Sequence, residues 1–187
     1  MTLRRGFRAE AERQAKAIRD SLGLRAEDRL EIKLAAEGLG VTVVSADELI
    51  DVHRLEELDR IQAFAFSACT FEIGDSKVIV FNPLRSSARQ ASDTAHELGH
   101  IILRHDLTEF REIAGVPFRT CRADQEEEAT ALAGALLLPR PLLLKAAKKG
   151  LTIDEIAKAH GVTIEMARFR YNTTGVARQL RRSTSGA

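Results

Sequence analysis

The chain has 187 residues, of which 44% are hydrophobic and 29% charged, which is ordinary for one globular domain with a small appendage at most. The formal net charge of +1 excludes a general bias of the whole molecule toward nucleic acid or membranes. The chain opens on a charged segment without an apolar signal, so Cys69 and Cys121 are expected to be reduced thiols in the cytoplasm. The longest apolar stretch, residues 129–139, is too short to span a bilayer.

The first half of the chain predicts two helices followed by a short sheet. Apolar residues recur with helical spacing over 8–22 and again over 26–37. The β-branched segment 41–45 predicts a strand. Two apolar runs within 62–81, separated by the turn at Gly74–Ser76, predict a β-hairpin.

The second half predicts mainly helices. The expected helices cover residues 87–105, 124–138, 141–150, 153–160 and 164–173, with Asp124, Thr152 and Thr163 as N-caps. Residues 106–122 predict a loop, and the arginine-rich tail after Gly175 predicts a frayed end. The order of elements predicts an α+β fold with a short antiparallel sheet.

The segment DTAHELGHIILRHD contains His96 and His100, four residues apart, with Glu97 between them. On a helix, positions four apart project from one face, so both imidazoles can bind one ion at about 2.1 Å. Glu97 lies one residue round the helix, where it can accept a proton instead of binding the ion. This H-E-x-x-H pattern is typical of zinc hydrolases, although two histidines can also simply line a polar helix face.

A zinc hydrolase needs a third protein ligand and an open fourth position. His105 lies well round the helix from His100, and Asp106 would reach the ion only if the helix ended early. The segment QEEEATALAGALLLP is the better source, because its glutamates open an otherwise apolar helix, although glutamates there also interact favourably with the helix dipole. Glu126 is the preferred ligand, because it shares a face with small residues that allow close approach to Gly99.

Together the two motifs resemble the ImmA/IrrE-type metallopeptidases. That family typically shows an apolar hairpin, an Asn, R-x-x-x-x-x-A-H-E-x-x-H and then E-x-E-A-N-x-F-A-x-x-L-L-x-P. Here VIVFN, RQASDTAHELGH and EEEATALAGALLLP follow in that order. The resemblance covers residues 62–143 well and 162–176 more loosely, and it implies a small zincin-like metallopeptidase domain.

The resemblance also implies roles for individual residues. His96 and His100 match the two zinc ligands of the family, Glu97 its catalytic base and Glu126 its glutamate ligand. The chain departs from the family at two positions, with Thr130 in place of Asn and Leu132 in place of Phe. If the register of the motif slipped by one or two residues, Glu127 or Glu128 would be the ligand instead.

The predicted function is a zinc-dependent endopeptidase that cleaves a protein substrate. The resemblance implies that this substrate is a helix-turn-helix transcriptional repressor or antitoxin encoded nearby, with a role in transcription regulation and stress response. The hairpin of residues 62–81 could accept an extended substrate as an added strand. Tyr171, the single tyrosine, is a weak candidate for a transition-state donor.

The alternative is a DNA-binding or scaffolding regulatory protein with a structural or inactive metal site. Residues 151–187 resemble a helix-turn-helix, and Arg168 and Arg170 fall on its second helix. The predicted organisation is therefore a metallopeptidase domain over 1–150, followed by these helices and a basic tail. An intact Glu97 favours the peptidase, and direct nucleic-acid binding is not expected with only two arginines on that helix.

Overall fold

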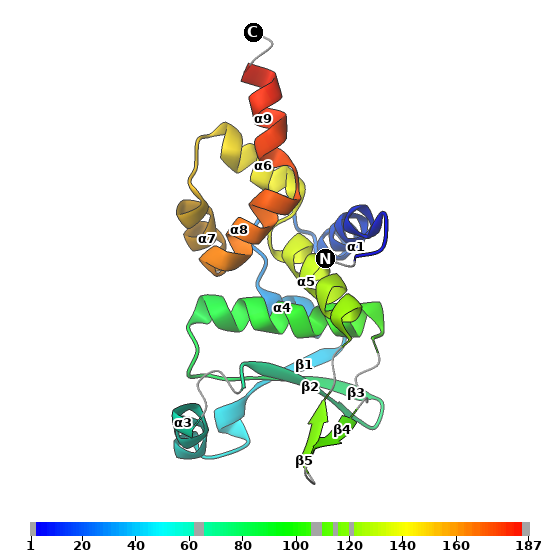
Figure 1. The fold of residues 1–187 in the computed structure, drawn as a ribbon, viewed down its shortest axis with the longest axis vertical. Coiled ribbons are helices and arrows are strands. Elements are labelled where there is room, and N and C mark those ends of the chain that lie inside the picture. Colours follow the sequence, from blue (N-terminus) through cyan, green and yellow to red (C-terminus); the bar gives the residue numbers. More distant parts are fainter. Residues whose placement is uncertain (1–2, 62–65, 106–109, 114–115, 120–121, 185–187) are drawn as a thin grey trace.

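The computed structural model describes residues 3–61, 66–105, 110–113, 116–119 and 122–184, and these form a mixed α+β structure (Figure 1). The helices are α1 (Phe7–Ser21), α2 (Ile32–Gly38), α3 (Val52–Ile61), α4 (Ser87–Leu103), α5 (Ala123–Leu137), α6 (Arg140–Lys148), α7 (Ile153–His160), α8 (Ile164–Thr173) and α9 (Val176–Thr184), with a 3-10 turn η1 (Ala46–Glu48). The strands are β1 (Val41–Ser45), β2 (Ala68–Ile73), β3 (Ser76–Phe81), β4 (Phe110–Ile113) and β5 (Val116–Arg119).

The main sheet has three strands in the order β1-β3-β2. The expected hairpin is present: β2 and β3 pair antiparallel, from Ala68 opposite Phe81 to Ile73 opposite Ser76. The expectation of a purely antiparallel sheet is wrong, because β1 pairs parallel to β3, with Val41 opposite Lys77. Parallel neighbours need a long connection, and η1, α3 and β2 together supply it between β1 and β3.

The central strand β3 is buried on both faces, which explains its continuous apolar sequence. On one face, Ile79 joins the main hydrophobic core, which also contains Leu98 of α4. On the other face, Val80 packs in a smaller cluster with Ala46 of η1 and Leu55 of α3. Helix α4 therefore crosses one face of the sheet and α3 lies against the other (Figure 1).

Helices α4 and α5 pack against each other more extensively than any other pair of helices in the described structure. A Cβ atom on Gly99 of α4 would lie only 2.9 Å from the carbonyl oxygen of Ala129 on α5. Glycine at this position therefore allows the two backbones to touch, as the small residues of α5 predict. Helices α1 and α8 pack on α5 as well, and the buried residues of α5 form the centre of the main core.

The helix expected over residues 26–37 is shorter than predicted, since α2 begins at Ile32. The chain before it is held by the buried side chain of Arg19, which donates hydrogen bonds to the carbonyl oxygens of Arg25 and Asp28. The backbone N–H of Arg25 in turn donates to the carboxylate of Asp28, at 2.8 Å. These bonds give the carbonyl oxygens of this segment hydrogen-bond partners although the segment is not helical. Local helix propensity could not predict such contacts.

Three other expectations need correction. The segment 106–122 is more than a loop, because β4 and β5 form a small hairpin within it. Asp124 is not the N-cap of α5: Arg122 occupies that position, and Asp124 lies in the first turn, where it pairs with Arg122 at 2.8 Å. The tail after Gly175 forms helix α9, so its described part is not frayed. The caps at Thr152 and Thr163 are confirmed.

Candidate metal centre

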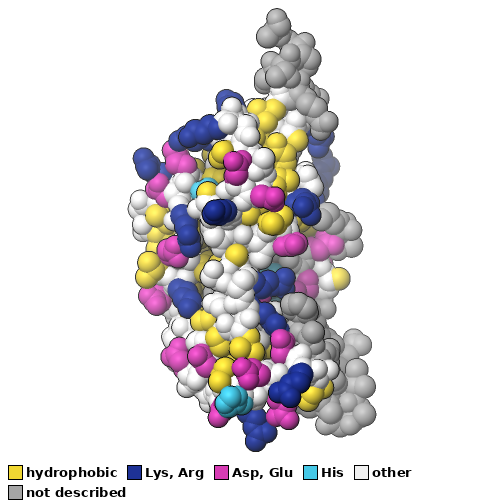
Figure 2. All heavy atoms as spheres, turned by 90° about the vertical axis from the view of Figure 1, so that its left-hand side faces the viewer, with side chains coloured by type: hydrophobic (Ala, Val, Ile, Leu, Met, Phe, Trp, Pro, Cys, Tyr) yellow, Lys and Arg dark blue, Asp and Glu magenta, His cyan; other side chains and the backbone are white. Residues whose placement is uncertain are grey.

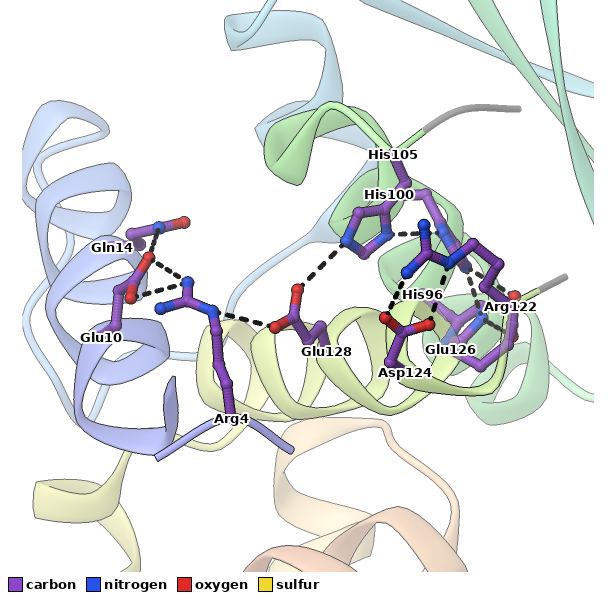
Figure 3. Close-up of polar contacts among 10 residues, drawn as sticks. All are labelled: Arg4, Glu10, Gln14, His96, His100, His105, Arg122, Asp124, Glu126 and Glu128. Atoms are coloured by element: carbon purple, nitrogen blue, oxygen red, sulfur yellow. Dashed lines mark hydrogen bonds and ion pairs between the residues drawn. The ribbon is translucent and has the colours of Figure 1, made fainter. Parts of the chain in front are cut away.

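Helix α4 presents its polar face and its apolar face as the sequence predicts. Its N-terminus is capped by Ser86, whose hydroxyl accepts a hydrogen bond from the backbone of Arg89. Ala95 and Leu98 are fully buried in the core. The opposite face carries His96 and His100, which are directed toward the first turns of α5 (Figure 3).

Three of the predicted side chains converge on one point. The Nε2 atoms of His96 and His100 lie 3.1 Å apart. The carboxylate of Glu126 places Oε2 3.0 Å from Nε2 of His96 and Oε1 3.2 Å from Nε2 of His100. Tertiary contact between α4 and α5 therefore brings Glu126 to two histidines that precede it in the chain by 30 and 26 residues.

The donor set and its dimensions fit a zinc ion. Ligand atoms about 2.1 Å from a tetrahedral zinc ion lie about 3.4 Å from one another. The three atom pairs here, at 3.0–3.2 Å, are close to that separation. Two imidazoles and one carboxylate are also the ligand types of open catalytic zinc sites. Among the described residues, these three form the one cluster of metal-ligating side chains.

The cluster is open on one side. The side chain of His100 is only 4% exposed, whereas those of His96 and Glu126 are 25% and 36% exposed. A small pocket of about 150 Å³ lies beside Glu126 and is lined by Leu3, Thr130 and Phe169 as well. The partial exposure of His96 and Glu126 leaves one side of the cluster accessible to solvent.

Glu97 lies beside this cluster without belonging to it. It is 8% exposed, and its Oε2 accepts a hydrogen bond of 2.6 Å from the hydroxyl of Thr70. Thr70 is in the middle of β2, which lies at one edge of the three-stranded sheet formed by the described residues. The sequence analysis did not single out Thr70, because no spacing rule relates a strand residue to a helix residue 27 positions later.

His105 is a second residue whose place the sequence analysis missed. Helix α4 ends at Leu103, and Arg104 adopts a left-handed conformation with φ of 54°. This bend brings Nδ1 of His105 to 3.0 Å from Nδ1 of His100, on the side away from Glu126 (Figure 3). His105 is therefore no ligand to the convergence point. Burial, and secondarily His100, lower the pKa of the His105 imidazole against the opposing effect of Glu128.

The three adjacent glutamates of α5 point in different directions, since each step on a helix turns the side chain by about 100°. Glu126 faces the two histidines of α4. One oxygen of Glu127 accepts a hydrogen bond from the backbone N–H of Leu3, at 3.1 Å. Glu128 lies 3.4 Å from Nε2 of His105 and 3.0 Å from Nε of Arg4. The geometry therefore singles out Glu126 as the member of the trio that meets both histidines.

The remaining candidates lie away from the cluster or outside the described residues. Tyr171 packs against the hydrophobic core. Asp106 and Cys121 fall among the residues that the structure does not describe. A cavity of about 390 Å³ lies near the C-terminal end of α5, between α1 and Pro139, and none of the candidate ligands lines it.

A mixed α+β fold in which an H-E-x-x-H helix and a glutamate form one metal-binding cluster defines a candidate metal-dependent peptidase. The family comparison agrees: the sequence profile of the IrrE N-terminal-like domain, a peptidase family, matches residues 36–172. The match covers most of the chain, so the chain belongs to this family. The resemblance found in the two motifs is thereby confirmed.

Comparison with other proteins adds little beyond the fold. No curated protein shows a significant sequence match. Among solved structures, the chain is similar to a Mycobacterium tuberculosis transcriptional regulator, with 20% identity and a TM-score of 0.54. The match covers 85% of this chain and 45% of that protein, so the chain spans less than half of its length. At this identity the likeness shows a shared fold alone.

The helices offer no simple membrane span. In the described parts of the chain, no single helix is both long and apolar enough to cross a bilayer. Helices α5 and α6 have the length and composition of a membrane span only when they are counted as one segment, and they are bent by 54° at the break between them. The apolar residues of α5 lie in the protein core, which accounts for their character.

Proposed function

We propose that the protein is a zinc-dependent endopeptidase that hydrolyses a peptide bond in a protein substrate. The observation that carries this proposal is the convergence of His96, His100 and Glu126 within ligand distance of one another, with Glu97 beside them. A purely structural zinc site is normally closed by four protein ligands. Three ligands, one open side and an adjacent carboxylate suit a catalytic site better.

Each residue of the site has a defined task in this mechanism. His96, His100 and Glu126 would hold zinc, which when bound makes water a nucleophile near neutral pH and polarises a peptide carbonyl. Glu97 accepts the proton of the attacking water and delivers it to the leaving amine nitrogen. Thr70 holds one oxygen of Glu97 through its hydroxyl and thereby fixes the orientation of the base.

The edge strand β2 offers a surface on which a polypeptide can bind. Among the described strands, β2 pairs with β3 along one edge, and we propose that an extended segment of the substrate pairs with its other backbone edge. Phe71 and Ile73 on this strand are 50% and 65% exposed and can contact substrate side chains. Because Thr70 of the same strand contacts Glu97, a segment added to β2 would run beside the base.

The identity of the substrate rests on the family resemblance. We propose a helix-turn-helix repressor or antitoxin encoded nearby, cleaved in the cytoplasm as part of transcription regulation under stress. The same proposal includes a zincin-like metallopeptidase domain over residues 1–150 and a separate helical segment over residues 151–187.

The second candidate function is a DNA-binding or scaffolding role. The structural likeness to a transcriptional regulator favours it. The arginines of α8 do not favour a DNA-binding role. Arg168 is exposed, but Arg170 is only 5% exposed and cannot contribute to a basic surface. On the face that carries α7, positive and negative side chains of the described residues are interspersed, and these residues form no continuous basic patch (Figure 2).

The test of the proposed function has two parts. Purified protein should carry about one zinc ion per chain, and His96→Ala or His100→Ala should lose it. Glu97→Gln keeps the size of the side chain but removes the base, so this variant should retain zinc and lose cleavage of the physiological substrate. Wild-type protein that takes up no zinc, or a Glu97→Gln variant that cleaves at the wild-type rate, would contradict the proposal.

A further inference from the structure

The far side of His100 carries a chain of polar contacts that the mechanism above does not use (Figure 3). Nδ1 of His100 lies 3.0 Å from Nδ1 of His105. Nε2 of His105 lies 3.4 Å from Oε2 of Glu128, and Oε1 of Glu128 accepts a hydrogen bond of 3.0 Å from Nε of Arg4. The side chains of His100 and His105 are only 4% and 7% exposed, so solvent does not replace these contacts.

If His100 is a neutral imidazole that binds the metal through Nε2, one arrangement of protons satisfies every contact in this chain. A neutral histidine that binds a metal through Nε2 carries its proton on Nδ1. The Nδ1–H of His100 then donates to Nδ1 of His105, which must accept and therefore carries its own proton on Nε2. That Nε2–H donates to the carboxylate of Glu128, which also accepts from Arg4. The arrangement leaves the lone pair of His100 Nε2 directed at Glu126 and His96.

We propose that His105 and Glu128 are positioning residues that hold His100 in the tautomer and ring orientation needed to bind zinc. The inference rests on the proposed function, because it concerns the same site. Metal-binding histidines usually donate their second N–H to a carboxylate or carbonyl, and loss of such a partner typically costs 10–100-fold in metal affinity. Here His105 lies between His100 and Glu128, so the carboxylate of Glu128 acts on His100 through a second imidazole.

The other histidine has a weaker support. Nδ1 of His96 lies 3.3 Å from the hydroxyl of Thr130. This partner is uncharged and is not backed by a carboxylate in the contacts around it. The two proposed ligand histidines are therefore held unequally, because only the partner of His100, the more buried of the two, is itself bonded to a carboxylate.

The backbone before His105 adds a further reason to regard the contact as built into the fold. Arg104 is the one non-glycine residue with positive φ in the described chain. The left-handed conformation is unfavourable for a non-glycine residue, because its Cβ comes too close to the following carbonyl oxygen. It ends α4 and closes the helix through a bond of 3.0 Å from the backbone N–H of His105 to the carbonyl of His100. The same turn places the His105 ring against His100.

The experiment compares zinc affinities by competition with a chelator, using the full chain. His105→Leu removes the acceptor and should lower zinc affinity about 10–100-fold. His105→Gln supplies an amide oxygen that can accept the Nδ1–H of His100, so it should recover part of the loss. In the cobalt-loaded protein, His105→Leu should shift the visible absorption bands, because the ligand field changes when His100 is no longer held.

Glu128→Gln and Glu127→Gln form a matched pair on adjacent positions. Glu128→Gln should lower zinc affinity about 10-fold, the lower end for loss of an outer partner, whereas Glu127→Gln should leave it unchanged. Thermal unfolding of the zinc-free proteins shows whether each variant folds. If His105→Leu does not fold, the glutamate pair decides the question, because Glu128 is partly exposed and its replacement leaves no large cavity.

The outcomes separate this inference from the proposed function. Reduced affinity in His105→Leu and Glu128→Gln, with partial rescue by glutamine at position 105, supports the positioning role. Equal affinities of Glu128→Gln and Glu127→Gln, or equal losses in the leucine and glutamine variants of His105, would overturn it while wild-type zinc binding stands. Absence of zinc binding in the wild type would overturn the proposed function itself, and this inference with it.

Discussion

Charged side chains lie at both ends of helix α5: its own glutamates at the N-terminal end, and arginines of α1 and α8 at the C-terminal end. At the N-terminal end, Glu126 and Glu128 meet imidazole rings of α4 and of the turn that follows it. At the C-terminal end, two buried arginines donate to main-chain carbonyls: Arg19 to Leu136 at 2.7 Å and Arg170 to Leu138 at 3.0 Å. The arginines thereby satisfy carbonyls that the helix leaves without intrahelical partners.

The difference separates a candidate site from a structural contact. At the C-terminal end, Arg170 also forms an ion pair with Glu12, so its guanidinium group is bound by both a carboxylate and the carbonyl oxygen of Leu138. At the N-terminal end, two imidazole nitrogens and a carboxylate converge on one point, an arrangement that a cation bound among them would satisfy. The presence of charge therefore does not distinguish the candidate site from the structural contact, whereas the convergence of possible ligand atoms does.

The largest expected effect concerns the N-terminal end of α5. Glu126→Ala should lower zinc affinity by more than about 100-fold, beyond the loss expected for an outer partner, because it removes a proposed ligand. Glu127→Ala should leave zinc affinity near the wild-type value. Chelator competition on the purified variants measures both. Loss of zinc from Glu127→Ala but not from Glu126→Ala would show that the glutamate register is wrong.

A smaller effect is expected at the C-terminal end, on stability and not on metal binding. Arg170→Leu leaves the carbonyl of Leu138 and the carboxylate of Glu12 without this partner, which should lower the free energy of unfolding by about 3 kcal/mol. Arg168→Leu, on the exposed side of the same helix, should change it by about 0.5 kcal/mol or less. Urea unfolding of the zinc-free proteins provides the measurement. Equal effects of the two substitutions would contradict a structural role for Arg170.

The smallest effect is expected in the middle, where α4 and α5 touch. Alanine normally stabilises a helix by about 1 kcal/mol relative to glycine. At Gly99, however, the added methyl group would meet the backbone of Ala129, so Gly99→Ala should destabilise the protein by about 1–3 kcal/mol. It should also weaken zinc binding by moving Glu126 away from the histidines. A stabilised Gly99→Ala variant with normal zinc affinity would show that the helix contact does not hold the site together.

Local sequence patterns predicted most of the helices, because their caps and apolar faces are properties of short segments. Thr152 and Thr163 cap α7 and α8 as expected. The parallel pairing of β1 with β3 was not predictable in this way, since it depends on the path of the chain between them. The chain before α2 is non-helical because the side chain of Arg19 donates to the carbonyls of Arg25 and Asp28, a contact that no helical periodicity predicts.

The sequence by itself determined the candidate chemistry of this protein. The spacing of His96 and His100 places both imidazoles on one helix face, and the E-E-E-A segment narrows the third ligand to three adjacent glutamates. Among these three, the sequence favours Glu126, and the tertiary structure places that side chain against both histidines, since α4 and α5 meet where Gly99 touches Ala129. The roles of Thr70, His105 and Glu128 likewise follow from contacts between elements, for which a linear pattern contains no information.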